Sequence, residues 1–130
     1  MPYAINHVHI RSMDPHNSAA WYERHFGAKI VSEREVMPGT ITIGMEVGGS
    51  CRLNISSKPA GSSDERAAAE LNRLGLEHFG FDVENLKEEL GRLENSDVRI
   101  VLPFTDVGRG TCLAYIEGPD NVLIELVEHK

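Results

Sequence analysis

The two halves of this 130-residue chain repeat one another at a constant offset of 71 positions, without a gap. His7 corresponds to His78, and Asn54 corresponds to Glu125. The same offset relates Gly39-Thr40 to Gly110-Thr111, Glu46 to Glu117, and Ile30-Val31 to Val101-Leu102. Because one register persists along both halves, we predict two copies of one structural unit in the chain.

The size of the chain favours one compact domain over residues 1–130. With 41% hydrophobic content, a chain of this length can bury one core. The first module is expected over residues 1–57 and the second over residues 76–130. A connector over residues 58–75 is predicted to contain a short helix, from residue 64 to residue 74.

Charge and composition narrow the class of partner. The formal net charge is −7 and the pI about 5.3, whereas nucleic acids and anionic membranes bind basic surfaces. No apolar run approaches the roughly 20 residues of a membrane span, and residues 1–3 lead directly into a strand pattern. We therefore expect a cytoplasmic protein with a small-molecule partner, no nucleic acid and no membrane. Cys51 and Cys112 lie in apolar segments and are expected to be reduced and partly buried.

The pattern of the first module predicts the order βαβββ. Residues 4–11 alternate between polar and apolar side chains, which indicates a strand. A helix is expected between Asp14, a suitable N-cap, and Gly27, a suitable residue to follow the last turn. Three further strands are expected, starting at residue 30 and spanning residues 40–47 and 51–56.

The second module is predicted to follow the same order. A strand is expected over residues 78–82 and a helix over residues 84–93, with Leu86, Leu90 and Leu93 on one face. Further strands are expected over residues 98–102, 111–116 and 122–127. The predicted fold class is therefore α+β, with four strands in each module.

Strand parity predicts one polar face in each module. These faces carry His7, His9, Arg11, Thr42, Gly44, Arg52, Asn54, Ser56, Gly80, Leu113, Tyr115 and Glu125. The opposite faces are almost wholly apolar and are expected to pack under the helices. Glu125 is flanked by Ile124 and Leu126, and burying this carboxylate would be costly without a cation or hydrogen-bond partners. We therefore predict that His7, His78 and Glu125 meet in one cleft.

Two imidazoles and one carboxylate are suitable ligands for a divalent metal. Such a set can hold Fe(II), Mn(II), Ni(II), Co(II) or Zn(II) while leaving positions open for substrate, and it does not choose among these ions. The alternative is that both histidines are ordinary sheet residues and Glu125 a surface carboxylate. Three convergent positions at repeat-related sites favour metal binding.

Motifs along nearly the whole chain carry a family resemblance. They are Ile5-Asn6-His7-Val8, Asp14-Pro15, Trp21-Tyr22, Glu77-His78-Phe79-Gly80-Phe81 and Gly118-Pro119-Asp120-Asn121-Val122-Leu123-Ile124-Glu125-Leu126. In these motifs the chain resembles the vicinal oxygen chelate superfamily, which includes glyoxalase I, methylmalonyl-CoA epimerase, fosfomycin-resistance thiol transferases, bleomycin-resistance proteins and extradiol dioxygenases. The resemblance implies two tandem βαβββ modules forming a U-shaped, eight-stranded mixed sheet around a metal cleft, with helices outside. It also implies His7, His78 and Glu125 as ligands of one divalent metal ion, in a homodimer that sometimes exchanges modules.

Three further residues are candidates for catalysis. Asn54 occupies the place of a metal-binding glutamate in glyoxalase I, and an amide cannot act as a base; it is a weak ligand, a substrate contact or a simple sheet amide. Tyr115 lies ten residues before Glu125, a spacing that resembles the catalytic tyrosine of extradiol dioxygenases, although it also suits a pocket wall. His9 is a candidate acid or base, with a solvated cleft histidine as the alternative.

Arg11, Arg52 and Arg109 are candidates for binding a carboxylate or phosphate of the substrate. Each alone also fits an ordinary surface charge. The leading functional prediction is a metal-dependent lyase, isomerase or epimerase that stabilises an enolate or anion. The alternatives are an Fe(II) ring-cleaving dioxygenase and a drug-binding protein of the bleomycin-resistance type without catalysis.

Overall fold

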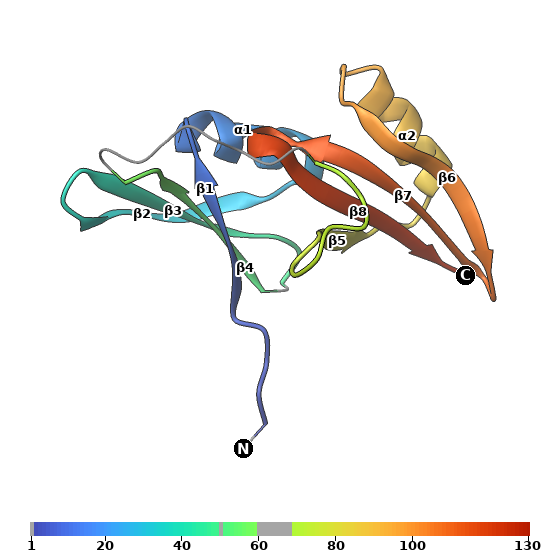
Figure 1. Ribbon diagram of the computed structural model, residues 1–130, viewed down its shortest axis with the longest axis horizontal. Helices are drawn as coiled ribbons and strands as arrows, with labels where there is room; N and C mark the ends of the chain where they lie inside the picture. The colour runs from blue at the N-terminus through green and yellow to red at the C-terminus, as the bar shows by residue number, and fades with distance from the viewer. Residues whose placement is uncertain (1, 50, 60–68) are drawn as a thin grey trace. The chain divides into compact units, whose positions relative to one another are not determined.

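The computed structural model describes residues 2–49, 51–59 and 69–130. Within these residues it contains eight β-strands and two α-helices (Figure 1). They belong to two compact units, unit 1 (Met1–Glu65) and unit 2 (Arg66–Lys130). No helix among the described residues has the length and apolar content needed to cross a membrane.

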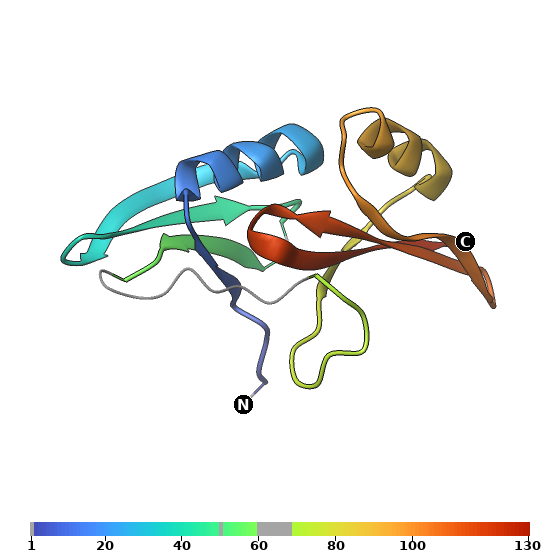
Figure 2. The same cartoon turned by 45° about the horizontal axis from the view of Figure 1, so that its top comes forward.

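Unit 1 is one four-stranded mixed sheet with a helix on one face. Its elements are β1 (His7–Ser12), α1 (Pro15–Phe26), β2 (Lys29–Met37), β3 (Thr40–Glu46) and β4 (Arg52–Ser57). The strand order is β1-β4-β3-β2, with β1 parallel to β4 and the other pairs antiparallel. Figure 2 shows α1 lying along the sheet.

Unit 2 has the same topology. Its elements are β5 (Phe79–Asp82), α2 (Leu86–Glu94), β6 (Ile100–Gly108), β7 (Thr111–Gly118) and β8 (Val122–His129), with a short 3-10 turn over Pro119–Asn121. The strand order is β5-β8-β7-β6, and β5 is parallel to β8. The predicted α+β fold of two tandem βαβββ modules is therefore confirmed.

The repeat extends to the register of the strands. In unit 1 His9 pairs with Asn54 between β1 and β4, and in unit 2 Gly80 pairs with Glu125 between β5 and β8. Each residue of the second pair lies 71 positions after its counterpart in the first. The two halves of the sequence therefore build the same sheet in the same register.

Helix α1 begins and ends where its capping residues predict. The side chain of Asp14 accepts a hydrogen bond from the backbone N–H of Asn17 at 3.1 Å, which satisfies one of the unpaired donors of the first turn. Gly27 ends the helix in the left-handed region, at φ 65°, where a glycine has no steric penalty. Helix α2 begins at Leu86, two residues later than expected, because Asn85 acts as its N-cap.

Two segments differ from the sequence-based expectation. Strand β6 runs over Ile100–Gly108, well beyond the predicted end at residue 102, with register shifts against β7. It is an edge strand, so it tolerates Pro103, which lacks a backbone donor. The helix predicted in the connector is not seen over residues 69–74, where Asn72 has a φ of 70° that no α-helix contains; residues 64–68 of that prediction lie outside the described residues.

The core of each unit lies between the sheet and its helix. In unit 1 the buried apolar side chains include Ile10, Tyr22, Ile43, Leu53 and Ile55, and in unit 2 they include Leu86, Leu90, Leu93, Ala114, Ile116, Ile124 and Leu126. The strand residues in these two lists lie on the sheet faces that were predicted to be apolar. Cys112 is buried, Cys51 is half-buried, and both are unpaired thiols as predicted.

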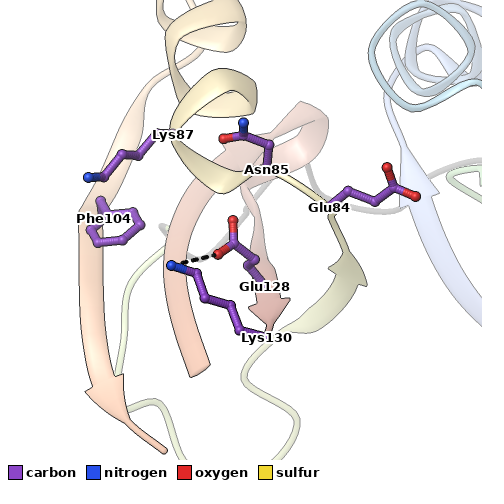
Figure 3. A pocket seen from close by; sticks show the side chains of 6 residues that line it. All are labelled: Glu84, Asn85, Lys87, Phe104, Glu128 and Lys130. Atoms are coloured by element: carbon purple, nitrogen blue, oxygen red, sulfur yellow. Dashed lines mark ion pairs between the residues drawn. The ribbon is translucent and has the colours of Figure 1, made fainter. Parts of the chain in front are cut away.

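A buried carboxylate fixes the first turn of α2. Glu128 on β8 is 8% exposed, and its Oε1 accepts a hydrogen bond from the backbone N–H of Leu86 at 2.8 Å. Its Oε2 lies 3.9 Å from Nζ of Lys130. Figure 3 shows Glu128 in a groove of about 320 Å³ that Lys87 and Phe104 also line. The carboxylate satisfies an orphan donor at the positive end of the helix dipole.

Replacing Glu128 by alanine is expected to lower the free energy of unfolding by about 2 kcal/mol, because a buried hydrogen bond to a charged group is lost and Leu86 keeps an unpaired donor. Denaturant titration measures this loss. The control is Glu94→Ala, which removes an exposed carboxylate at the end of α2 and is expected to change stability by about 0.5 kcal/mol or less. Equal losses in the two variants would contradict the capping role.

Candidate metal centre

His78 and Glu125 come together in unit 2. Glu125 lies on β8, between Gly80 of β5 and Tyr115 of β7, and His78 immediately precedes β5. Nε2 of His78 is 3.6 Å from Oε1 of Glu125, and the two side chains are 25% and 18% exposed. A half-buried nitrogen and oxygen therefore face each other at the sheet surface.

The hydrogen bond of the other ring nitrogen sets the tautomer of His78. Nδ1 lies 2.7 Å from Oε1 of Glu77. A carboxylate oxygen only accepts, so Nδ1 carries a proton in this hydrogen bond, and in the neutral ring the lone pair that a metal ion would bind is on Nε2. Two ligand atoms about 2.1 Å from one ion at a tetrahedral angle are about 3.4 Å apart. The donor set and its 3.6 Å separation thus fit two neighbouring positions around a divalent metal.

Tyr115 orients the carboxylate of Glu125. Its hydroxyl donates to Oε2 of Glu125 at 3.0 Å, and its ring meets the His78 ring edge-on, with centroids 5.0 Å apart. Burial, the hydrogen bond to Glu125 and the negative charges of Glu125 and Glu77 raise the pKa of Tyr115 to about 12. The hydroxyl is therefore protonated at neutral pH and occupies Oε2, which leaves Oε1 directed at His78.

Gly80 leaves room for Glu125. A Cβ atom at this position would lie 3.3 Å from Oε1 of Glu125 and 3.4 Å from its Cβ. The 3.3 Å separation is tighter than ordinary van der Waals contact, so a side chain at this position would push Oε1 aside by a few tenths of an ångström. The close contact with Glu125 thus gives a steric reason for glycine at position 80 of the Glu77–Phe81 motif.

In unit 1, His7 is exposed at the start of β1, and its Nδ1 donates to Oδ1 of Asn6 at 2.9 Å. His9 lies two residues on, and its Nε2 is 2.8 Å from Oγ of Ser56. Oγ of Ser56 is in turn 2.7 Å from Oγ1 of Thr42. Partial burial, followed by the charges of Arg11 and His7, holds the pKa of His9 below its usual value. His9 is therefore a hydrogen-bonded imidazole whose neutral form is favoured.

Asn54 is half-buried on β4 and pairs with His9 on one side and Gly44 on the other. Its counterpart Glu125 pairs with Gly80 and Tyr115. In unit 1 the polar residue of β4 thus lies between a histidine on β1 and a glycine on β3. In unit 2 the polar residue of β8 lies between a glycine on β5 and a tyrosine on β7. The predicted polar faces are confirmed by these pairings.

Arg11 and Arg52 lie four residue pairs apart along β1 and β4 of unit 1, and Arg109 belongs to unit 2. Nη1 of Arg11 donates to the carbonyl oxygen of Ser57 at 2.9 Å, and Arg52 is exposed and pairs with His7 in register. Arg109 is exposed in the turn between β6 and β7, at φ 57°. It precedes Tyr115 by six residues, which in a strand correspond to about 20 Å. Arg109 therefore lies at the far end of the hairpin from Glu125.

Two contacts of the histidines escaped prediction. Asn6 and Glu77 each bind Nδ1 of the histidine that follows, and the repeat offset relates these two residues as it relates His7 and His78. The equivalence of Asn6 and Glu77 is the sequence signal that indicates a shared contact with the following histidine. In the described part of the chain, no three His, Cys, Asp or Glu side chains form a complete metal-binding group; His78 and Glu125 belong to unit 2, and His7 belongs to unit 1.

Sequence comparison identifies one family. Residues 4–126 match the family model described as the Glyoxalase/Bleomycin resistance protein/Dioxygenase superfamily. This match covers nearly the whole chain. No curated protein matches the sequence significantly.

Solved structures with the same fold cover nearly all of the chain. A glyoxalase family protein from Bacillus cereus is 22% identical with a TM-score of 0.82, and the match covers 98% of this chain and 95% of that chain. The fosfomycin resistance protein FosX from Listeria monocytogenes is 17% identical with a TM-score of 0.76, covering 100% and 96%. The trypanothione-dependent glyoxalase I of Leishmania major is 21% identical with a TM-score of 0.74, covering 98% and 87%. At these identities the likeness shows the fold.

Proposed function

The chain belongs to the glyoxalase/bleomycin resistance protein/dioxygenase superfamily, and on this premise we propose that it is a metal-dependent enzyme acting on a small substrate that chelates through oxygen atoms. Members of the superfamily typically use a divalent metal ion. The proposed reaction is that of a lyase, isomerase or epimerase passing through an enolate or related anion. A bound divalent ion would supply the positive charge that stabilises such an oxyanion.

The observation that carries the proposal is the arrangement of His78 and Glu125. Nε2 of His78 and Oε1 of Glu125 face each other at 3.6 Å, while Glu77 occupies Nδ1 and Tyr115 occupies Oε2. In each side chain, one polar atom is thus held by a hydrogen bond to a neighbour, and the other polar atom faces the second candidate ligand. Metal-ligating histidines and carboxylates in proteins have this pattern of outer hydrogen bonds.

His7 is the third ligand that we propose. The repeat relates it to His78, and its Nδ1 is likewise bound by the preceding side chain, that of Asn6. This hydrogen bond directs the lone pair to Nε2, the atom that would ligate. The remaining positions around the ion would be open to substrate and water.

The other candidates from unit 1 have proposed roles near the substrate. His9 keeps Nε2 on Ser56, so Nδ1 is the atom that we propose exchanges a proton with the substrate. Asn54 would orient substrate through its amide, and Arg11 or Arg52 would bind a substrate carboxylate. Because Asn54 is not a base, we do not propose the activity of glyoxalase I.

Metal content tests the proposal. Wild-type protein exposed to equal concentrations of Fe(II), Mn(II), Ni(II), Co(II) and Zn(II) is expected to retain about one ion per chain, measured by mass spectrometry after desalting. Glu125→Ala and His7→Ala are expected to lose it. Wild-type protein without stoichiometric metal would overturn the enzyme proposal and favour a drug-binding protein of the bleomycin-resistance type.

The reaction class has its own test. Metal-loaded protein incubated in D2O with a panel of α-hydroxy acids, ketones and acyl thioesters is expected to exchange the proton adjacent to the carbonyl for deuterium, detected by NMR. Exchange that requires the ion and is lost in His9→Ala supports proton abstraction by this chain. If metal-loaded protein exchanged no proton with any compound of the panel, the proposed enolate intermediate would be contradicted.

The contacts of Tyr115 favour a second candidate, an Fe(II) ring-cleaving dioxygenase. Its hydroxyl reaches Glu125 and its ring touches His78, so it would border any bound substrate. Oxygen uptake with catechols by the iron-loaded protein, lost in Tyr115→Phe, would establish this reaction in place of the first. No uptake would remove it.

Gly80→Ala is expected to weaken metal binding about 10-fold, a loss of the size seen when an outer hydrogen bond is removed, because the new methyl group displaces the Glu125 carboxylate. Co(II) titration measures the affinity. Gly91→Ala is the control: its Cβ meets no atom within 4 Å in α2, so affinity should not change. Full affinity in Gly80→Ala would contradict the steric role of this glycine.

We also propose a cytoplasmic homodimer, the assembly common in this family. The apolar side chains of Tyr3, Ile5, Leu74 and Leu76 are at least 76% exposed, and the repeat offset relates Tyr3 to Leu74 and Ile5 to Leu76. Exposed apolar side chains at equivalent places are typical of surfaces that bind a partner. Sedimentation equilibrium is expected to give twice the 14.4 kDa chain mass, and a monomer at all concentrations would exclude the dimer.

A further inference from the structure

Each candidate histidine is bound by the side chain of the residue before it. Asn6 accepts from Nδ1 of His7 at 2.9 Å, and Glu77 accepts from Nδ1 of His78 at 2.7 Å. The repeat offset relates the two pairs. The same outer contact therefore occurs twice, once with an amide and once with a carboxylate.

Glu77 is held at both of its oxygen atoms. Oε1 binds His78, while Oε2 accepts from the backbone N–H of Asn72. Asn72 lies in a turn, in the left-handed region at φ 70°. The carboxylate thus spans from this turn to the imidazole, which restricts rotation of both the carboxylate and the His78 ring.

We propose that Glu77 is a positioning residue that fixes the tautomer and orientation of His78 for metal binding; this inference rests on the proposed metal site. The hydrogen bond keeps a proton on Nδ1, so the neutral ring carries its lone pair on Nε2, the atom that lies 3.6 Å from Oε1 of Glu125. The negative charge of Glu77 also strengthens the imidazole as a donor to the ion. Asn6 holds His7 through a neutral amide, so it contributes less than Glu77.

Affinity for Co(II), measured by isothermal titration on the full chain, tests the proposal. Glu77→Gln keeps an acceptor but removes the charge, and is expected to weaken binding about 10-fold; Glu77→Ala removes both and is expected to weaken it about 100-fold. Asn6→Ala should lose less than Glu77→Ala. The control is Glu89→Gln, which removes one carboxylate charge from α2, where Glu89 pairs with Arg92, and should bind like wild type.

The tautomer gives a second readout that needs no metal. Long-range 1H–15N NMR of the metal-free protein at pH 8 is expected to show His78 with its proton on Nδ1 in wild type and Glu89→Gln. Glu77→Ala should show a mixture of the two tautomers. A purely structural role for Glu77 would leave the tautomer unchanged, and circular dichroism confirms that each variant is folded.

The two proposals fail in different ways. Unchanged Co(II) affinity in both Glu77 variants, with binding abolished in Glu125→Ala, would overturn the role of Glu77 and keep the metal site. Equal Co(II) binding by wild type and Glu125→Ala would overturn the metal site as proposed. In that case, an unchanged tautomer in Glu77→Ala would also overturn the positioning of His78.

Discussion

His78→Ala is expected to lower the affinity for divalent metal by more than about 100-fold and to leave no stoichiometric ion on the protein. Loss of an outer hydrogen bond to a ligand costs 10- to 100-fold, and loss of the ligand atom itself exceeds this. In unit 2, Nε2 of His78 and Oε1 of Glu125 face each other and are the two atoms that we propose bind the ion. Without His78, Glu125 keeps its hydrogen bond to Tyr115 but loses the ring nitrogen that faces its Oε1.

Thermal unfolding in the presence and absence of metal measures this effect. At a concentration of 100 times Kd, a ligand that binds only the folded state adds about 2.7 kcal/mol to stability, so the Tm of wild type should rise with metal. That of His78→Ala should not. The matched control is His129→Ala, which removes an exposed imidazole of the same unit and should retain the rise. A metal-dependent rise of equal size in His78→Ala would exclude His78 as a ligand.

Leu126→Ala is expected to lower the free energy of unfolding by about 3 kcal/mol. Leu126 is 0% exposed on β8, next to Glu125 but on the apolar face, so the substitution removes buried surface and leaves a cavity under α2. This loss is a large share of the 5–15 kcal/mol that stabilises a typical domain.

Guanidinium titration of metal-free protein measures the loss in Leu126→Ala. Ile30→Ala serves as the comparison, because Ile30 is 47% exposed on the edge strand β2 and should cost about 1 kcal/mol or less. Losses of similar size at the two positions would show that the face of β8 opposite Glu125 is not the core.

Elements with local signals were predicted well. The N-cap Asp14 and the left-handed Gly27 bound α1 as expected, because capping depends on residues within one turn. Strand β6 was predicted too short, since Pro103 normally interrupts a strand. Only the position of β6 at the sheet edge makes this residue acceptable, and that position depends on the whole topology.

The candidate site also contains features that the sequence predicts and features that it does not. Strand parity placed Glu125 and Tyr115 on one face, and their pairing in register confirms it. The contact of Glu77 with His78 was not predicted, because neighbouring residues in an extended chain point to opposite faces. The meeting of His7 with His78 and Glu125 stays a prediction.

The sequence by itself determined the tandem modules and the polar and apolar faces, because these follow from a constant offset and from the period of a strand. The tertiary structure alone decided which atoms face each other. The 3.6 Å separation of Nε2 and Oε1 brings together β8 and the residue before β5, which are distant in sequence. The register of β5 and β8 is set by packing of the whole sheet, which no local pattern specifies.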